Sequence, residues 1–460
     1  MKMKTIWSYL IILMFTTSLM AQNILSTSEF EIIKKNAYKD FHPAIQSAMI
    51  ENSIKKLSLN PDLRSQPDPY FKYQIKTGKP TDQKRSGRCW MFASMNTLRP
   101  FVIDKYNLSN FEFSYVYLFF YDQLEKSNLF LEGIIATVDK PMDDKQVEWW
   151  FKNPITDGGV WSSFVNLVNK YGLVPADAMP ETYHSNNTRE VSSIIATKLR
   201  EHGIMMREAY AKNKKVDLQK MKTTALSEIY RILVYAFGEP PNTFTYRFVD
   251  KNNKPTELKT YTPISFYNEI ININFDDFVM LMDDPTRPYY KVYEIEYDRN
   301  VVEGINWKYL NLPIDEIKAS AMLSLKDSMA MYFSCDVGKQ LNNDIGLLDI
   351  NNYMYDTLFN LPFRMNKKQR IITFESGSAH GMTLIGVDTD INDKPTRWLI
   401  ENSWGNAGYN GKLIMTDEWM DEYLFRLVVH KKYLPETTLN LLKQKPILLP
   451  SWDPMFKMDD

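Results

Sequence analysis

The sequence predicts an α+β fold with a helical lobe, a sheet-rich lobe and a large, mainly helical insertion between them. Apolar residues with helical spacing follow Cys89, whereas short apolar runs typical of strands occur at Lys291–Tyr297 and dominate the chain after residue 330, and they are expected to form the sheet-rich part. The region between these parts is charged and mostly helical in pattern, and 460 residues are enough for such an arrangement. The expected segments are a signal peptide (1–21), the helical lobe (22–185), the insertion (186–330), the sheet-rich lobe (331–450) and a C-terminal arm (451–460).

The composition excludes several classes of function. Lysine and arginine number 55 against 56 aspartates and glutamates, so the formal net charge is −1. Because a nucleic-acid surface needs a clear basic excess or stripe, we expect no nucleic-acid partner. The chain has two cysteines and no Cys-X-X-Cys or His/Cys cluster. We therefore expect neither a disulfide framework nor a metal site, and no cofactor.

The first 21 residues have the order of a secretory signal. Lys2 and Lys4 precede an apolar stretch from Ile6 to Phe15, and Ala21 stands at a suitable cleavage point. The stretch is short for a membrane helix, which needs about 20 apolar residues. An uncleaved anchor is the alternative. We expect an exported protein, periplasmic or extracellular, with no stable membrane span once the signal is cleaved.

The stretch QKRSGRCWMFASMNTLRP, residues 83–100, predicts a reactive cysteine. Cys89 follows a Ser-Gly-Arg turn and lies in the first turn of an expected helix that Pro100 ends or kinks. A helix N-terminus carries roughly +0.5 charge, which favours a thiolate. Gln83, six residues upstream, offers a side-chain amide as a hydrogen-bond donor. The alternative is that Cys89 is a small buried hydrophobic residue, as most free cysteines are.

Two later motifs favour the catalytic interpretation. His380 directly precedes an apolar, strand-like run, and Asn402 ends another such run immediately before Ser-Trp-Gly. A cysteine at a helix start, a histidine at a strand start and an asparagine before SWG, in this order, resemble the catalytic set of papain-like cysteine peptidases. The other four histidines have no comparable setting.

A set of longer blocks, spread over almost everything after residue 70, makes the resemblance more specific. They are SGRCWMFA (86–93), DGGVWSSFVNLVNKYGLVP (157–175), YLNLPIDEIK (309–318), CDVGK (335–339), ENSWG (401–405), MTDEWMDEY (415–423) and WDPM (452–455). Together they resemble the bleomycin hydrolase and aminopeptidase C branch of the papain-like peptidases. The resemblance implies a papain-like fold, aminopeptidase activity on peptide substrates, and a homo-oligomer that is a hexamer in this family. The signal sequence departs from the family, whose members are usually cytosolic.

The spacing of the motifs accounts for the insertion. Cys89 and His380 are 291 residues apart, whereas papain-type enzymes place the histidine roughly 130–150 residues after the cysteine. About 140–160 residues are therefore inserted between the two halves of the cleft. Upstream of them, Asp157, Gly158 and Gly159 are expected to line a substrate cleft, because glycines allow a peptide backbone to approach closely. A plain turn before a helix is the alternative.

These residues predict hydrolysis through an acyl-enzyme thioester. Cys89 would attack as a thiolate paired with protonated His380, and Asn402 would orient the imidazole. The side chain of Gln83 and the backbone N–H of Cys89 would stabilise the oxyanion. Trp404 would shield the Asn–His hydrogen bond or simply pack in the core. The second cysteine of the chain lies in an apolar run and is interpreted as a buried structural thiol.

The C-terminal arm bears on specificity. In relatives, the resemblance implies, the arm lies in the cleft and its terminal carboxylate faces the substrate's amino group. Here WDPM is followed by Phe-Lys-Met-Asp-Asp, residues 456–460, which is bulkier and more acidic than expected. We expect Asp460 to contact the substrate amine. An arm outside the cleft, giving an endopeptidase or a dipeptide-releasing enzyme, is an alternative, as are a disordered tail and a non-catalytic scaffold of the same fold.

Overall fold

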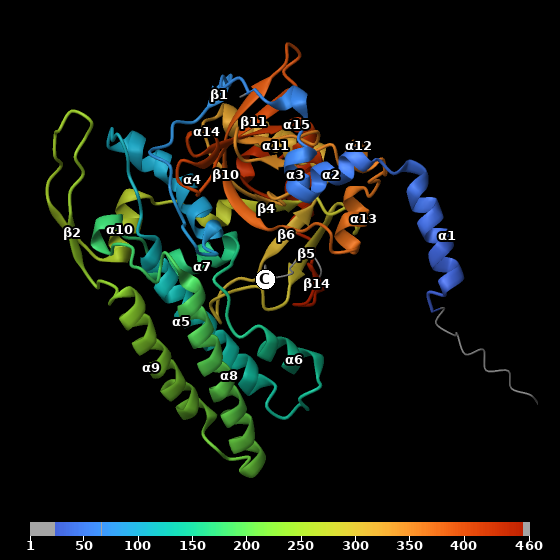
Figure 1. Cartoon of the computed structure of the whole chain (residues 1–460). Coiled ribbons are helices and arrows are strands. Elements are labelled where there is room, and N and C mark those ends of the chain that lie inside the picture. Colours follow the sequence, from blue (N-terminus) through green and yellow to red (C-terminus); the bar gives the residue numbers. More distant parts are fainter. Residues whose placement is uncertain (1–23, 66, 454–460) are drawn as a thin grey trace, which may run out of the picture. The chain divides into compact units, whose positions relative to one another are not determined.

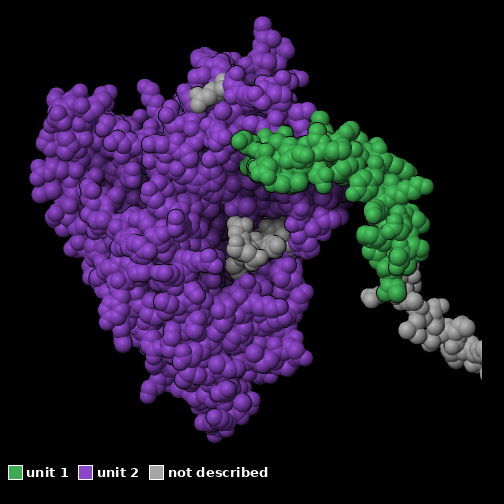
Figure 2. All heavy atoms as spheres, viewed as in Figure 1, with its two compact units in different colours: residues 1–58, 355–362 green, residues 59–354, 363–460 purple. Residues whose placement is uncertain are grey.

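The computed structural model describes residues 24–65 and 67–453 (Figure 1). The predicted signal peptide (1–21) and Asp460 lie outside these residues. The chain divides into two compact units, residues 1–58 with 355–362 and residues 59–354 with 363–460 (Figure 2). The compact units therefore do not follow the segment boundaries that the sequence suggests near residues 185 and 330. Within the described residues, no helix is long and apolar enough to cross a membrane.

The first unit is built from short helices. Ser26 and Glu29 form a capping box at the first of them, because the Ser26 hydroxyl accepts the Glu29 N–H at 3.2 Å and the Glu29 carboxylate accepts the Ser26 N–H at 2.9 Å. None of the described helices of this unit buries a side chain. These helices are α1 (Thr27–Ala37), α2 (Pro43–Glu51), α3 (Ile54–Leu57) and α12 (Tyr355–Phe359).

Long helices form one part of the second unit. Helix α5 is rich in aromatic residues and starts at Tyr115, because the Ser114 hydroxyl accepts the Tyr117 N–H at 3.2 Å. Helices α8 and α9 pack against each other and against α5 (Figure 1). The helices are α4 (Cys89–Lys105), α5 (Tyr115–Ala136), α6 (Lys145–Lys152), α7 (Trp161–Tyr171), α8 (Thr188–Lys212), α9 (Leu218–Phe237) and α10 (Pro263–Ile270).

Helix α4 begins at Cys89, as predicted, but it does not end at Pro100. The helix continues through the proline to Lys105. Proline inside a helix removes one hydrogen bond and costs about 3 kcal/mol. Pro100 itself and most other side chains of α4 are buried. The apolar contacts of this buried helix offset the cost of the proline, and no local sequence signal reveals them.

A large sheet forms the other part of the second unit. Its strand order is β14-β5-β6-β4-β13-β7-β10-β11-β12-β9-β8, and β1 pairs with β10. The strands are β1 (Tyr73–Gln74), β4 (Phe278–Met282), β5 (Lys291–Ile295), β6 (Lys308–Asn311), β7 (Met331–Cys335), β8 (Leu341–Asn342), β9 (Leu347–Leu348), β10 (His380–Thr389), β11 (Pro395–Glu401), β12 (Lys412–Thr416), β13 (Leu424–His430) and β14 (Ile447–Leu449).

The sheet draws three strands from the region expected to be the insertion. Strand β4 pairs antiparallel with β13, and β6 and β5 follow outward from β4. Within the expected insertion, the first strand of the sheet starts at Phe278, whereas residues 188–270 hold helices and the small hairpin β2 (Phe244–Tyr246) and β3 (Lys259–Tyr261). The shorter helices of this part are α11 (Ile314–Lys326), α13 (Lys367–Ile372), α14 (Ala407–Asn410), α15 (Asp417–Tyr423) and α16 (Glu436–Leu441).

Helix α4 is joined to the sheet by buried polar contacts. The Thr383 hydroxyl on β10 donates to the Ala93 carbonyl on α4 at 3.0 Å. The Arg99 guanidinium on α4 pairs with the Glu401 carboxylate at the end of β11, with 2.9 Å between Nη1 and Oε1. Both partners of this ion pair are almost completely buried. These contacts bring the helix that begins at Cys89 to the strands that begin at His380 and end before Asn402.

The Arg99→Met substitution is expected to lower the free energy of unfolding by about 3–5 kcal/mol, because it leaves a buried carboxylate without its partner. Urea unfolding followed by circular dichroism measures this loss. The matched control is Lys152→Met, which removes an exposed ion pair with Glu148 on α6 and is expected to change stability little. Equal stability of the two variants would contradict the structural role of the buried pair.

Candidate active site

The start of α4 is shaped by the turn before it. Both Met91 and Phe92 donate their N–H groups to the Arg88 carbonyl, at 2.9 and 3.0 Å, so the first helical turn encloses Cys89. Gly87 is required here because a Cβ at this position would lie 2.2 Å from a carboxylate oxygen of Asp157. The thiol therefore lies at the positive end of the helix dipole, where a thiolate is favoured.

His380 is oriented by Asn402, as the sequence predicts. Its Nε2 lies 2.9 Å from Asn402 Oδ1. The backbone N–H of Ser403 also donates to this oxygen, at 2.8 Å, which identifies the oxygen as the acceptor. His380 Nε2 must therefore carry the hydrogen, and in the neutral ring Nδ1 is the basic nitrogen. The imidazole is held in the tautomer that can accept a proton at Nδ1.

Burial sets the proton affinity of this ring. It lowers the pKa of His380 to about 4, and the hydrogen bond to Asn402 opposes the shift. The sequence predicts a protonated His380 beside a thiolate, whereas burial favours the neutral imidazole. The neutral ring is the form that takes the proton from the thiol. Trp404 covers the imidazole, with ring centroids 4.9 Å apart, so the residue expected to shield His380 does contact it.

Gln83 lines the same cavity as Cys89 and His380. Its side-chain oxygen accepts a hydrogen bond from the Ser403 hydroxyl at 2.6 Å, and its backbone N–H donates to the Ser403 carbonyl at 2.9 Å. Its Nε2 donates to the Ser86 carbonyl at 2.6 Å, which uses one of the two amide hydrogens. Ser403 therefore holds both Gln83 and Asn402. Ser403 belongs to the NSWG motif, but the motif alone does not indicate this role.

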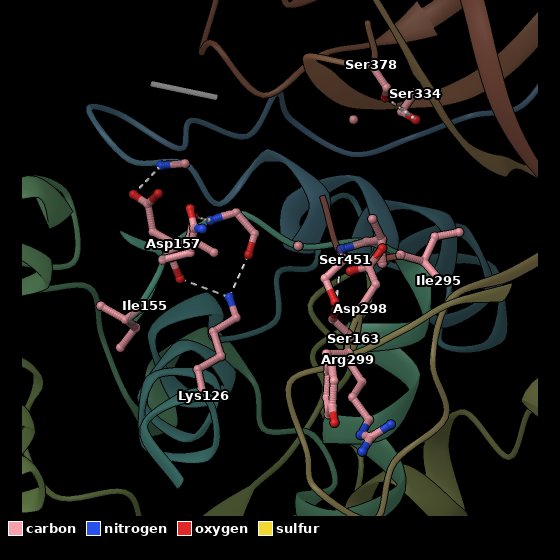
Figure 3. A pocket seen from close by; sticks show the side chains of 18 of the residues that line it. Lys126, Ile155, Asp157, Ser163, Ile295, Asp298, Arg299, Ser334, Ser378 and Ser451 are labelled. Atoms are coloured by element: carbon pink, nitrogen blue, oxygen red, sulfur yellow. Dashed lines mark hydrogen bonds between the residues drawn. The ribbon is translucent and has the colours of Figure 1, made fainter. Parts of the chain in front are cut away.

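Asp157, Gly158 and Gly159 also line this cavity (Figure 3). The Asp157 carboxylate accepts the Gly87 N–H at 2.7 Å and the Thr188 hydroxyl at 2.5 Å, and its carbonyl accepts Trp90 Nε1 at 2.9 Å. Asp157 therefore positions the turn before Cys89 rather than presenting a free carboxylate to a ligand. A Cβ at residue 159 would lie 2.7 Å from the Trp90 ring, so this position requires glycine.

Lys126 on α5 fixes the same loop, a role that no sequence motif indicated. Its ammonium donates to the Thr156 carbonyl at 2.9 Å and to the Gly158 carbonyl at 2.5 Å (Figure 3). It also pairs with the buried Asp122 carboxylate at 2.7 Å. All three hydrogens of the ammonium thus have acceptors, and the loop is held against the helical part.

Three predictions remain: that Cys335 is a buried structural thiol, that the chain has no metal site, and that Asp460 in the C-terminal arm contacts the substrate. Cys335 is completely buried, and burial raises the pKa of its thiol well above the ordinary range, so it is the inert cysteine of the pair. No group of three or more His, Cys, Asp or Glu side chains suited to a metal ion occurs within residues 24–65 and 67–453. Asp460 lies outside the described residues.

An NMR titration of histidine-labelled protein is expected to place the pKa of His380 near 4, with the signal assigned by its absence in His380→Gln. Asn402→Ala is expected to lower this pKa further, because the lost hydrogen bond opposes the effect of burial. A pKa at or above 6.5 in the wild-type protein would show that a charged partner, rather than burial, controls this ring.

Comparison with known proteins agrees with this geometry. The model of the Peptidase C1-like family matches residues 24–456. Aminopeptidase C of Listeria monocytogenes is 36% identical over 413 residues, which are 89% of this chain and 93% of that protein. Human bleomycin hydrolase is 40% identical over 391 residues, 82% of this chain and 86% of the relative. The crystal structure of pepw from Lactobacillus rhamnosis is 36% identical, with a TM-score of 0.90 over 95% of this chain and 99% of that chain.

These matches confirm the resemblance and the papain-like α+β fold that the sequence motifs indicate. A family model over almost the whole described chain, relatives well above 30% identity and a solved structure of the same fold agree with one another. The chain belongs to the Peptidase C1-like family.

Proposed function

We propose that the protein is a papain-like cysteine aminopeptidase that hydrolyses peptide bonds through a thioester acyl-enzyme. The observation that carries this proposal is the convergence of Cys89, His380 and Gln83 on one cavity, with Asn402 hydrogen-bonded to the imidazole. Relatives named aminopeptidase C and bleomycin hydrolase support the same activity. No cofactor takes part in the reaction as we propose it.

The geometry suggests how the steps proceed. His380 Nδ1 takes the proton of Cys89, and the sulfur attacks the scissile carbonyl carbon. The second side-chain N–H of Gln83, which Ser86 does not use, and the backbone N–H of Cys89 hold the oxyanion, and each such donor contributes about 100- to 1,000-fold in turnover. His380 then gives its proton to the leaving amine, which departs as the thioester forms. Finally His380 takes a proton from water, the resulting hydroxide attacks the thioester, and the proton returns to the sulfur.

The position of the C-terminal segment favours removal of single residues from the amino end. Strand β14 pairs with β5, and the Ser451 hydroxyl donates to the Glu296 carbonyl at 2.6 Å. Ser451 lines the cavity that contains Cys89, and Asp453 pairs with Arg287. The described chain therefore ends beside the cavity. We propose that residues 454–460 extend into it and that Asp459 and Asp460 attract a free α-amine. An arm outside the cavity would make the enzyme an endopeptidase or release dipeptides.

Fluorogenic peptides with a free amine are expected to be cleaved in preference to the same peptides after N-acetylation. Deleting residues 456–460 should lower this preference by about fivefold, the equivalent of the roughly 1 kcal/mol that a partly exposed charge contact contributes. The matched control is Asp459→Asn with Asp460→Asn, which keeps the bulk of the arm and removes its charge. An unchanged preference after the deletion would show that the arm does not determine specificity. Absence of turnover in the wild-type protein would favour the alternative of a non-catalytic scaffold.

The first unit supports assembly with further copies of this chain. Apolar side chains are exposed along its helices although none is buried within them. The exposed set includes Phe30, Ile32, Ile33, Tyr38 and Ile50. We propose that these side chains are covered in a homo-oligomer, and a hexamer is the state that the family resemblance implies. Sedimentation analysis tests this, and a monomer at micromolar concentration would contradict it.

The leader sequence suggests export. Lys2 and Lys4, the apolar run and Ala21 form the pattern of a cleaved signal, so we propose that the mature protein begins near Gln22 in the periplasm or outside the cell. Mass spectrometry of the protein from its own cells tests this proposal. An intact segment from Met1 to Ala21 on protein recovered from the cytosol would contradict it.

A further inference from the structure

A second carboxylate lines the cavity that contains Cys89 and His380. Asp298 belongs to the loop that follows β5 and contributes to the cavity wall (Figure 3). Its carboxylate has no hydrogen bond and no ion pair within 4.0 Å to any other residue in the ranges 24–65 and 67–453. The Asp157 carboxylate, which lines the same cavity, differs in this respect because it accepts hydrogen bonds from the Gly87 N–H and the Thr188 hydroxyl.

The loop holds this carboxylate in a fixed place. The Asp298 carbonyl accepts the Trp307 N–H at 2.8 Å, and the Ile295 N–H donates to the Trp307 carbonyl at 3.0 Å. Tyr297, directly before Asp298, has a φ of +62°. A bulky residue in this left-handed region is strained, and such strain is kept mainly where the surrounding structure and function require it. The loop is therefore built to present Asp298 to the cavity.

The charges that face Asp298 do not neutralise it. Arg426 on β13 and Lys126 on α5 are the cations in electrostatic reach, and Tyr332 on β7 also faces this region. The three hydrogens of Lys126 are donated to Asp122 and to the loop carbonyls of residues 156 and 158. The Arg426 guanidinium lies over the Trp307 ring, 3.5 Å from its centroid. Burial raises the pKa of Asp298 to about 6 even though both cations oppose the shift.

We propose that Asp298 binds a positively charged group of the peptide substrate, either an alkylammonium or a guanidinium. This inference rests on the proposed peptidase function. A partly buried carboxylate without a protein partner is stabilised when a cation enters beside it, and the same contact anchors the ligand that carries the cation. The group is supplied either by the free α-amine of the peptide or by a lysine or arginine side chain. In both cases Asp298 is a specificity-determining residue that acts through substrate binding.

Asp298→Asn removes the charge and keeps the shape, so it isolates this contact. The expected result is a 10- to 100-fold lower kcat/KM for cationic substrates, as follows from losing a hydrogen bond to a charged group. The loss should appear mainly as a higher KM, because the contact exists before and during the reaction. The matched control is Asp344→Asn, an exposed carboxylate that does not line the cavity, and it should change nothing.

Three fluorogenic substrates separate the two sources of the cation. A leucyl substrate with a free amine tests the α-amine, an N-acetylated arginyl substrate tests the side chain, and an N-acetylated leucyl substrate has neither charge. A selective loss on the first assigns Asp298 to the α-amine, and a selective loss on the second assigns it to basic side chains. Equal kcat/KM for wild type and Asp298→Asn on all three, or an equal loss on all three, would overturn the proposal.

The pH dependence gives a readout that a merely structural role would not move. With a raised pKa of about 6, the carboxylate is ionised above pH 6 and becomes protonated below it. In the wild-type protein, KM for the cationic substrate should therefore rise as the pH falls through 6, while in Asp298→Asn this rise should be absent. A rise of the same size in both proteins would contradict the proposal.

Calorimetry keeps this test independent of turnover. In a Cys89→Ala background, leucinamide and N-acetyl-argininamide serve as probes of the two cations, and N-acetyl-leucinamide serves as the uncharged control. Binding of one cationic probe that is lost with Asp298→Asn would support the site even if no peptide were hydrolysed. Identical titrations with and without Asp298 would overturn it, whatever the activity of the enzyme.

Discussion

The buried guanidinium of Arg99 is the constraint on which the active site depends. It lies in the middle of α4, seventeen residues that begin at Cys89, and it pairs with Glu401, the residue directly before Asn402. An unpaired charge at this depth would cost several kcal/mol. The ion pair therefore holds α4 against β11. Its acceptors are Glu401 Oε1, Asn96 Oδ1, Asn110 Oδ1 and the carbonyls of Lys79 and Phe111. The helix that begins at Cys89 and the strand that ends beside Asn402 therefore cannot shift independently.

A series of hydrogen bonds extends this arrangement to the side chains of the proposed catalytic site. Ser403 binds Asn402 through its backbone N–H and Gln83 through its hydroxyl, and Asn402 holds the imidazole of His380. The Asp157 carboxylate accepts the N–H of Gly87 and so links the turn before Cys89 to the loop that contains Asp157. The site is preorganised in this way from both halves of the fold, so that little reorganisation is required when charge develops on the substrate.

Much of this arrangement could be predicted from the sequence, because the proposed catalytic residues Cys89, His380 and Asn402 lie in local motifs of fixed order. Properties that depend on tertiary contacts could not be predicted. The continuation of α4 through Pro100 depends on burial, and the membership of β4 and β6 in the sheet depends on the pairing of β4 with β13 and of β6 with β4. Lys126 and Asp298 belong to no recognisable sequence motif. Their proposed roles depend on the oxygens and charged groups that surround them in the folded protein.

The central claim is that Cys89 is the nucleophile and that His380 takes its proton. Alkylation with a thiol-directed epoxide, followed by peptide mapping and an activity assay, tests it most directly. The account predicts one label per chain, located on Cys89, with activity lost in proportion, slower labelling in His380→Ala and no label on the buried Cys335. Activity that survives complete labelling of Cys89, or inactivation that follows labelling of Cys335, would contradict it.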